Sequence, residues 1–405
     1  MSATMQKSAA RRTPARKGDD DALPPVIVFH GNDNALSIVR CLGRRSIRVY
    51  VLNDPGADVQ FSRYARPLSL REDLPFTEAA VQFLTSGESD FLKGAVLLAA
   101  SDDALEVISN HRNVLATKFR LDLSNTAAQQ KMLDKLATYD AAREAGVPTP
   151  RHWEVDSTAD VHALRDQFVY PLIVKPKLSH LFQKMFNSKF IVADCFDEVV
   201  DAYQIAEAAG IGVVLMEKIP GPDSQLCSYY TYLDENGEPQ FDFTKRIIRR
   251  HPTNMGLACY HVTDHVDGVR ELSLKLWQHV GLRGLANAEF KLDERDGQLK
   301  LIECNARFTG GNSLVASAGF DLASFVYNRL VGIPQPPLTH FRKGLRMWDP
   351  LRDFRAYREL SHRGEMTFFG WLRSVLRPQT FPAFCWTDPK PALVRLARRI
   401  RKSRH

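Results

Sequence analysis

The chain has 405 residues, of which 44% are hydrophobic and 25% charged, and this composition excludes a fibrous or wholly disordered protein while allowing two or three packed domains. Its net charge of +7 arises from 54 basic and 47 acidic residues, and the excess lies at the two ends of the chain. Because the middle is nearly balanced, and because none of the six cysteines forms a CxxC pair, we expect neither a nucleic-acid partner nor a zinc or redox-disulfide site.

The chain begins with a polar tail and then an α/β pattern. Residues 1–23 lack the apolar core of a signal peptide, so we expect a disordered tail on a cytoplasmic protein. No apolar run approaches the roughly 18 residues that span a bilayer. The apolar runs Val26–Phe29 and Val49–Leu52 enclose a helical pattern over Ala35–Leu42, as in a β-α-β unit. We therefore predict an open α/β domain over residues 24–120.

A third apolar run, Ala95–Ala99, ends close to Asp102 and Asp103. Open α/β sheets bind ligands at the carboxyl ends of their strands, so these two acids are candidates for holding an amino group. Capping of the following helix is the alternative.

The next part of the chain predicts a helical connector and a small mixed lobe. A helical pattern that includes Lys131 and Lys135 extends over residues 122–145. The small lobe, over about residues 148–220, contains three predicted strands and one helix, namely Pro171–Pro176, Phe190–Val192, Val213–Glu217 and Asp197–Ala209.

An antiparallel lobe is predicted over about residues 221–340. A turn at Glu235–Gly237 separates two alternating segments, and Val269–Val280 has helical spacing. The predicted strands Ala286–Leu292 and Leu299–Glu303 are joined by a short turn. The predicted fold class is therefore α/β with additional α+β lobes.

Residues 341–405 form a C-terminal extension. It contains the aromatic segments Phe368–Leu372 and Phe381–Trp386, followed by a short basic amphipathic helix in which apolar residues alternate with arginines over Leu393–Ile400. Such a helix either makes a peripheral contact with an anionic membrane surface or rests on the body of the protein with its arginines in water.

The strongest chemical signal lies on the last two predicted strands. With a short turn between them, Glu289 and Glu303 face each other, and Asn305 shares the face of Glu303 because side chains alternate along a strand. Two carboxylates and an amide oxygen are hard ligands of the kind that Mg²⁺ takes when nucleotide phosphates complete its shell. Arg307 lies two residues further on, where a guanidinium group can stabilise a phosphoryl-transfer transition state. An exposed hairpin with solvated charges is the alternative.

This arrangement resembles the ATP-grasp superfamily, whose late signature is an acidic residue followed by E-x-N-x-R, here Glu289 and Glu303–Arg307. The resemblance covers about residues 24–335. Four earlier features follow in the superfamily's order, namely Asp134-Lys135 with Ala145–Pro150, then Val174-Lys175-Pro176, Met216–Gly221 and Asp223.

The resemblance implies an ATP-grasp fold with a pre-ATP-grasp domain at the N-terminus, and ATP with Mg²⁺ or Mn²⁺ as cofactors. It implies that the metal ligands are Glu289, Glu303 and Asn305, and that the catalytic residues are Arg307, Lys175 and Arg246. A larger set then provides the phosphate, adenine and ribose contacts to the nucleotide, namely Lys135, Lys175, Ser179, His180, Lys189, Glu217, Lys218, Ile219 and Asp223.

One segment departs from the superfamily pattern. Residues 177–189 contain no glycine, although many members have a Gly-rich loop there that closes over the phosphates. Either side chains take over this contact, or the lid is weak and turnover slow. The candidate side chains are Ser179, His180, Lys184 and Lys189.

The run Arg246–Pro252 is similar to a subgroup that includes D-aspartate ligase-like enzymes. By this similarity, either Lys245 or Arg246 faces a phosphate or a substrate carboxylate, and Arg250 does so too. Exposure of these side chains to solvent is the alternative.

By implication the chain is an ADP-forming carboxylate–amine ligase that acts through an acyl phosphate on an amino acid or a small peptide-like substrate. Its partners are then a small-molecule carboxylate and an amine, and a homodimer is left open. One alternative is a nucleotide-binding scaffold or sensor without turnover, which the glycine-free lid favours. Another is a different ATP-grasp chemistry, either phosphoryl transfer or ligation of a thiol.

Overall fold

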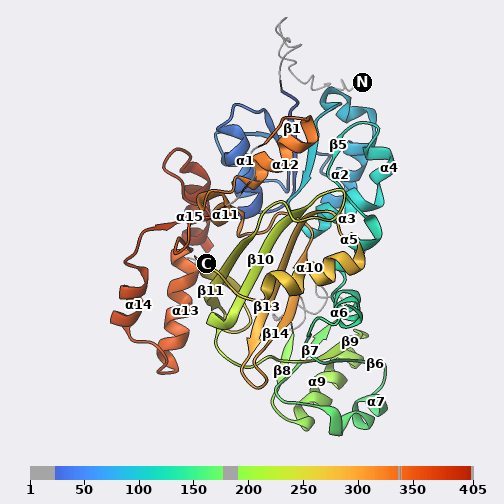
Figure 1. The fold of residues 1–405 in the computed structure, drawn as a ribbon, viewed down its shortest axis with the longest axis vertical. Helices are drawn as coiled ribbons and strands as arrows, with labels where there is room; N and C mark the ends of the chain where they lie inside the picture. Colours follow the sequence, from blue (N-terminus) through green and yellow to red (C-terminus); the bar gives the residue numbers. More distant parts are fainter. Residues whose placement is uncertain (1–22, 177–189, 336–337, 339, 403–405) are drawn as a thin grey trace, which may run out of the picture.

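The structure is a computed structural model that describes residues 23–176, 190–335, 338 and 340–402. Its described part contains a five-stranded parallel sheet, a seven-stranded sheet and a four-stranded sheet. Along the long axis of the molecule, the seven-stranded sheet lies between the other two (Figure 1). The predicted α/β class with α+β lobes is confirmed.

The parallel sheet near the N-terminus has the strand order β3-β2-β1-β4-β5. Its first strand is buried on both faces, because Val26 and Val28 belong to one hydrophobic core while Ile27 and Phe29 belong to another. The strands are β1 (Val26–Phe29), β2 (Val49–Leu52), β3 (Ala65–Pro67), β4 (Val96–Ala99) and β5 (Arg120–Leu121). The accompanying helices are α1 (Asp33–Gly43), η1 (Asp58–Phe61), α2 (Phe76–Thr85), η2 (Gly87–Leu92), α3 (Asp102–Asn110) and α4 (Arg112–Leu115).

The connector is two helices, α5 (Thr126–Leu133) and α6 (Lys135–Glu144), rather than the single helical stretch predicted from the sequence. Asp134 has an extended backbone, and its carboxylate accepts hydrogen bonds from the N–H groups of Leu136 and Ala137. An N-cap of this kind starts a new helix, so Lys135 becomes its first residue.

The four-stranded sheet is antiparallel, with the order β6-β9-β7-β8. Helix α9 packs on it and buries Val199 and Tyr203. The elements are β6 (His152–Val155), α7 (Thr158–Ala163), η3 (Arg165–Gln167), β7 (Leu172–Pro176), β8 (Ile191–Ala193), α9 (Phe196–Ala208) and β9 (Val213–Glu217).

The seven-stranded sheet has the order β14-β13-β10-β11-β12-β15-β16. Helix α10 covers one face, where Trp277 stacks on Tyr229 with ring centroids 5.7 Å apart. The strands are β10 (Leu226–Leu233), β11 (Phe243–His251), β12 (Leu257–Thr263), β13 (Gly284–Asp293), β14 (Gln298–Asn305), β15 (Arg346–Trp348) and β16 (Gln379–Thr380). The helices are η4 (Asp223–Gln225), α10 (Val269–Val280), α11 (Asn312–Ser317) and α12 (Leu322–Val331).

The C-terminal extension contributes β15 and β16 to the central sheet, and its three helices lie on one side of the molecule (Figure 1). These are α13 (Pro350–His362), α14 (Phe368–Val375) and α15 (Lys390–Lys402). The predicted helix near the C-terminus is confirmed. It packs on the body of the protein, but Arg395 forms ion pairs with Asp33 and Asp58 instead of facing water. The membrane contact stays a prediction. Within the described residues, no helix is both long and apolar enough to cross a bilayer.

Candidate nucleotide and metal site

Two glutamates face each other on neighbouring strands. Glu289 of β13 is the direct antiparallel partner of Glu303 of β14, and Asn287 is the partner of Asn305 in the same ladder. Because side chains alternate along each strand, all four lie on one face of the sheet. The cross-strand pair that the sequence pattern predicted is therefore present, and its role in metal binding stays a prediction.

Asn305 is held by a neighbour that the sequence analysis missed. Its amide nitrogen donates to Asn287 Oδ1 at 3.3 Å, and the amide nitrogen of Asn287 donates to the carbonyl of Tyr229 at 3.1 Å. Both asparagines are buried. This chain of hydrogen bonds fixes the plane of the Asn305 amide and leaves its oxygen as the acceptor beside the two glutamates.

The donor set fits a hard divalent cation that also binds phosphate oxygens. Nowhere in the described ranges do three or more His, Cys, Asp or Glu side chains come together as a metal cluster. A metal at Glu289 and Glu303 would thus have two carboxylates, the Asn305 oxygen and ligands from a bound nucleotide. Mg²⁺ is bound in this way, by a few carboxylates plus substrate phosphates.

Lys135 lies over the two glutamates. Its Nζ is 3.7 Å from Glu303 Oε1. Burial alone would lower the pKa of Lys135, but Glu303, Tyr139 and Glu289 outweigh burial and raise the pKa above its ordinary value. Tyr139 also donates a hydrogen bond to the carbonyl of Ile302 at 2.8 Å, which ties α6 to β14. The helix start at Asp134 therefore places a lysine at the carboxylate pair.

Arg307 lies beyond the end of β14 and forms a bidentate pair with Asp102. Its Nε and Nη2 are each 2.6 Å from an oxygen of that carboxylate. Burial opposes the charge of Arg307, but Asp102 and then Glu303 and Glu289 raise its pKa. Because β14 ends at Asn305, Arg307 lies on the segment after the strand, where it pairs with Asp102 of α3 and lies close enough to the two glutamates for their charge to raise its pKa.

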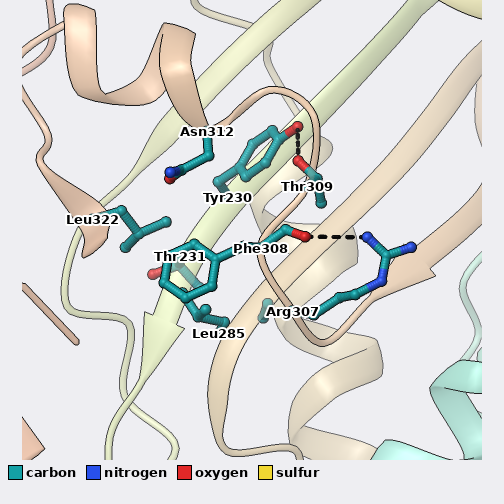
Figure 2. Close-up of a pocket in the computed structure, with 9 residues that line it drawn as sticks. Tyr230, Thr231, Leu285, Arg307, Phe308, Thr309, Asn312 and Leu322 are labelled. Atoms are coloured by element: carbon teal, nitrogen blue, oxygen red, sulfur yellow. Dashed lines mark hydrogen bonds between the residues drawn. The ribbon is translucent and has the colours of Figure 1, made fainter. Parts of the chain in front are cut away.

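The segment after Arg307 crosses the end of the central sheet (Figure 2). Arg307 Nη1 donates to the carbonyl of Phe308 at 3.1 Å, and the hydroxyls of Tyr230 and Thr309 lie 3.0 Å apart. Asn34 of helix α1 also donates to the carbonyl of Phe308, at 3.3 Å. These contacts hold the arginine segment between two sheets.

The sheet register decides between Lys245 and Arg246. Ser228 of β10 pairs with Glu289 on one side and with Lys245 on the other, so Lys245 lies on the face of the glutamates. Arg246, the next residue, points to the opposite face and pairs with Asp264 at 3.1 Å. The structure therefore places Lys245, and not Arg246, on the face of the glutamates, and the catalytic role of either residue stays a prediction.

Lys245 is buried, at 2% exposure, and its Nζ lies 5.6 Å from the centre of the Tyr230 ring. Within the described residues it has no carboxylate partner. The adjacent Ser228 hydroxyl is also buried without a hydrogen-bond partner there. A buried ammonium group and a free hydroxyl in one row with Glu289 suit an anionic ligand.

The predicted adenine hinge lies at the end of β9. Glu217 is buried; it accepts a hydrogen bond from the Arg151 N–H at 3.1 Å and pairs with Arg295 at 2.6 Å. The N–H of Lys218 donates to the carbonyl of Pro171 at 3.1 Å. These contacts fix the hinge between the small and central sheets.

Lys291 was missed by the sequence analysis. It lies two residues beyond Glu289 on β13, and its Nζ donates to the carbonyls of Ile219 at 3.0 Å and Gly221 at 2.7 Å. Burial, and then the positive charge of Arg250, lowers its pKa to about 8. The spacing in the sequence could have identified Lys291. It lies two residues after Glu289, and because side chains alternate along a strand, both lie on the same face of the sheet.

Asp223, the predicted ribose ligand, is engaged within the protein. It accepts hydrogen bonds from the backbone N–H and Nε of Arg250 at 3.1 and 2.7 Å, and from the N–H of Asn254 at 3.2 Å. Arg250, which was expected to face a phosphate or substrate carboxylate, thus pairs with Asp223. The nucleotide role of Asp223 stays a prediction.

The remaining predicted phosphate ligands belong to β7 and the segment after it. Lys175 is half-buried on β7, opposite Val214 of β9. Ser179, His180, Lys184 and Lys189 lie outside the described residues.

Three comparisons place this geometry among known proteins. A family model described as the carbamoyl-phosphate synthase L chain ATP-binding domain matches residues 261–332, which include both glutamate strands. The chain is 26% identical over 267 residues to the D-aspartate ligase of Enterococcus faecium, covering 63% of this chain and 63% of that protein. It is 26% identical over 193 residues to the D-alanine--D-alanine ligase of Ectopseudomonas mendocina, covering 45% and 58%.

The same architecture occurs in solved structures. The L-amino acid ligase from Bacillus licheniformis has a TM-score of 0.56 and 19% identity, with 78% of this chain and 75% of that chain covered. A biotin carboxylase–nucleotide complex from Campylobacter jejuni has a TM-score of 0.59 and 15% identity, with 76% and 72% covered. At these identities the likeness shows a shared fold.

Proposed function

We propose that this chain, which has the ATP-grasp fold, is an ATP-dependent, ADP-forming ligase that joins a carboxylate to an amine through an acyl phosphate. The observation that carries the proposal is that acidic and basic side chains come together on one face of the central sheet. Glu289 and Glu303 form the cross-strand pair, and Lys135 and Arg307 approach it from two other elements. An exposed hairpin would not bring two partly buried cations to its glutamates.

In the proposed reaction, Glu289, Glu303 and Asn305 hold Mg²⁺, or Mn²⁺, with the nucleotide. The metal neutralises and orients the phosphates when it is bound. Lys135 and Lys175 add positive charge along the phosphate chain, and Glu217, Lys218 and Ile219 line the adenine with backbone groups. The contacts of Lys291 support this assignment, since they hold the carbonyls of Ile219 and Gly221, just after β9, in place.

The chemical step is transfer of the γ-phosphoryl group to a substrate carboxylate. Arg307 stabilises the charge that develops on the transferred group, and Asp102 holds the guanidinium in position. An amine then attacks the acyl carbon and phosphate leaves. Water must be kept from this mixed anhydride, so the amine binds before or during closure of the lobes.

The substrate class follows from the relatives and from Lys245. The relatives are named as ligases of D-aspartate, D-alanine and L-amino acids, which supports an amino acid as one substrate here. The buried Lys245 lies on the same face as the glutamates and provides a fixed positive charge for a substrate carboxylate or for the transferred phosphoryl group. Asp102 is not available for the substrate amine while it pairs with Arg307.

A panel of amino acids and dipeptides in pairs tests the proposal by ADP release and product mass. The expected result is ADP formation that requires both an acid and an amine. Stabilisation of the fold by ATP without turnover on any pair would instead support a nucleotide-binding scaffold or sensor. A phosphorylated or thioester product would identify phosphoryl or thiol transfer as the ATP-grasp chemistry. The cytoplasmic location and the homodimer stay predictions.

A further inference from the structure

The apolar side chains exposed to solvent are concentrated in the C-terminal helices. Of the fifteen large hydrophobic residues that are exposed in the described part of the chain, nine lie in residues 351–400. They are Leu351, Phe354, Phe368, Phe369, Leu376, Trp386, Leu393, Leu396 and Ile400. Single exposed apolar residues are common, but such a concentration in one segment indicates a surface that is covered in use.

Four of these side chains, Leu351, Phe354, Phe368 and Phe369, lie on helices α13 and α14, which are held to the central sheet by buried contacts. Asp353 is fully buried; it pairs with Arg249 at 2.6 Å and accepts hydrogen bonds from the indole nitrogens of Trp348 and Trp371, both at 2.9 Å. Trp371 in turn stacks on Tyr357 with ring centroids 5.1 Å apart. The two helices therefore form a fixed pair beside the central sheet (Figure 1).

Arginines are interleaved with the exposed apolar residues of this pair. On α13, Phe354 is followed by Arg355 and Arg358, and Phe369 of α14 lies one helical turn before Arg373. None of these arginines has an ion-pair partner within the described residues. Arg377, just beyond α14, is exposed and likewise has no such partner there. Residues 350–377 contain six arginines and three acids.

The three acids offset little of this charge. Asp353 is committed to the buried pair with Arg249, and Glu359 pairs with Arg363 and accepts from the N–H of Thr253. Glu365 is the remaining acid, in the turn between the helices. The outward charge of the pair is therefore positive.

Helix α15 is docked by its basic side. Arg395 bonds to Asp33 at 2.6 Å and to Asp58 at 2.5 Å, and Arg398 pairs with Asp58 at 3.1 Å. The outward side then carries Leu393 and Leu396, which are 57% and 43% exposed. An amphipathic helix normally buries its apolar side, so this reversed packing presents an apolar strip to whatever lies outside.

We propose that the exposed sides of α13, α14 and α15, here called the basic flank, bind a membrane surface that carries anionic lipids. Phe354, Phe369 and Leu393 would enter the headgroup region, while Arg373 and Arg377 would pair with lipid phosphates. Charge complementarity favours a lipid surface, and a membrane needs no matching shape for side chains spread over three helices. This inference is independent of the ligase proposal, because the nucleotide site lies on other strands.

Sedimentation of the full chain with vesicles tests the inference. We expect binding to phosphatidylcholine vesicles that contain phosphatidylglycerol, little binding to phosphatidylcholine alone, and weaker binding as salt rises. Double replacement of Arg373→Glu and Arg377→Glu should lower the partition coefficient by about thirtyfold or more, since each basic residue near the surface contributes about fivefold. The matched charge control is Lys93→Glu with Lys131→Glu, which should bind as the wild type does.

A second pair of variants probes the apolar part. Phe369→Ser with Leu376→Ser should lower partitioning by about tenfold or more, whereas Phe91→Ser with Val114→Ser, exposed on the N-terminal domain, should not. All variants should melt as the wild type does, because the altered side chains are exposed. Failure of the wild type to bind anionic vesicles would overturn the inference. So would a dimer in light scattering that the basic-flank variants abolish without any change in vesicle binding.

Discussion

The guanidinium group of Arg307 and the carboxylate of Asp102 form a bidentate ion pair, with both N–O distances at 2.6 Å. Asp102 is the first residue of α3 and follows the end of β4, whereas Arg307 follows β14. The pair therefore joins the N-terminal sheet to the proposed phosphoryl-transfer site. Two hydrogen bonds to one carboxylate fix the orientation of the planar guanidinium group, so Asp102 acts as a positioning residue for Arg307.

Replacement of this pair should affect turnover more than nucleotide binding. Arg307→Lys should lower kcat for ADP formation by roughly 100- to 1,000-fold, because a lysine cannot reproduce the fork that stabilises the transition state. Asp102→Asn should lower kcat less, with KM for ATP little changed. Glu106→Gln, at an exposed position of the same helix, is the control and should retain full activity. Equal rates for Asp102→Asn and Glu106→Gln would remove the positioning role.

Lys245 and Arg246 form a matched pair of adjacent cations on opposite faces of the sheet. Lys245→Met should lower kcat/KM for the acid substrate by about 10- to 100-fold, since a buried charge on the substrate side is lost. Arg246→Met should leave it within about twofold, because an ion pair with Asp264 at the other face contributes little. Steady-state ADP release measures both. The opposite ranking would contradict the face assignment.

Lys291 should make the stability of the protein depend on pH. Burial lowers its pKa to about 8 in the folded state, against an ordinary value of 10.5. Between these two values the unfolded chain binds more protons than the folded chain, so the free energy of unfolding should rise with pH from about 8 to about 10. Urea unfolding at several pH values, compared with Lys291→Met, isolates the effect because the variant lacks this group. A wild type and a variant with parallel pH profiles would show that Lys291 keeps its ordinary pKa.

Asp388 should be a stability determinant of the extension. It is buried, pairs with Arg40 at 2.9 Å, and accepts from the hydroxyl of Ser62 and the N–H of Arg63. Asp388→Ala should reduce the free energy of unfolding by about 3–5 kcal/mol, since it leaves a buried guanidinium unpaired. Asp73→Ala, in an exposed pair, should leave the urea midpoint unchanged. A similar midpoint for both variants would mean that the extension is held by other contacts.

The elements that could be predicted from the sequence are those in which apolar residues recur with a clear strand or helix spacing. The strands around Val26 and Val49, the helix Val269–Val280 and the facing glutamates all follow from local pattern, because alternation along a strand fixes which side chains share a face. The break at Asp134 was missed because a cap residue inside a helical pattern differs little from a surface residue.

The register of β11 could not be predicted. Lys245 and Arg246 are adjacent, so a shift of one residue exchanges their faces, and only the pairing of Ser228 with Lys245 settles it. The ion-pair partners of Arg307 and Asp223 could not be predicted from the sequence either. Asp102, for example, lies 205 residues before Arg307, and their pairing depends on how the lobes pack. The reversed docking of α15 depends in the same way on distant acids, at Asp33 and Asp58.

The most direct test of the central claim is the Mg²⁺ dependence of ADP formation in Glu289→Gln and Glu303→Gln, with Asp296→Asn in the connecting turn as control. If the facing glutamates hold the nucleotide's metal, each Gln variant should need at least about tenfold more Mg²⁺ for half-maximal rate, or lose activity, while remaining folded. The control should match the wild type. Wild-type Mg²⁺ dependence and rate in both Gln variants would contradict the account.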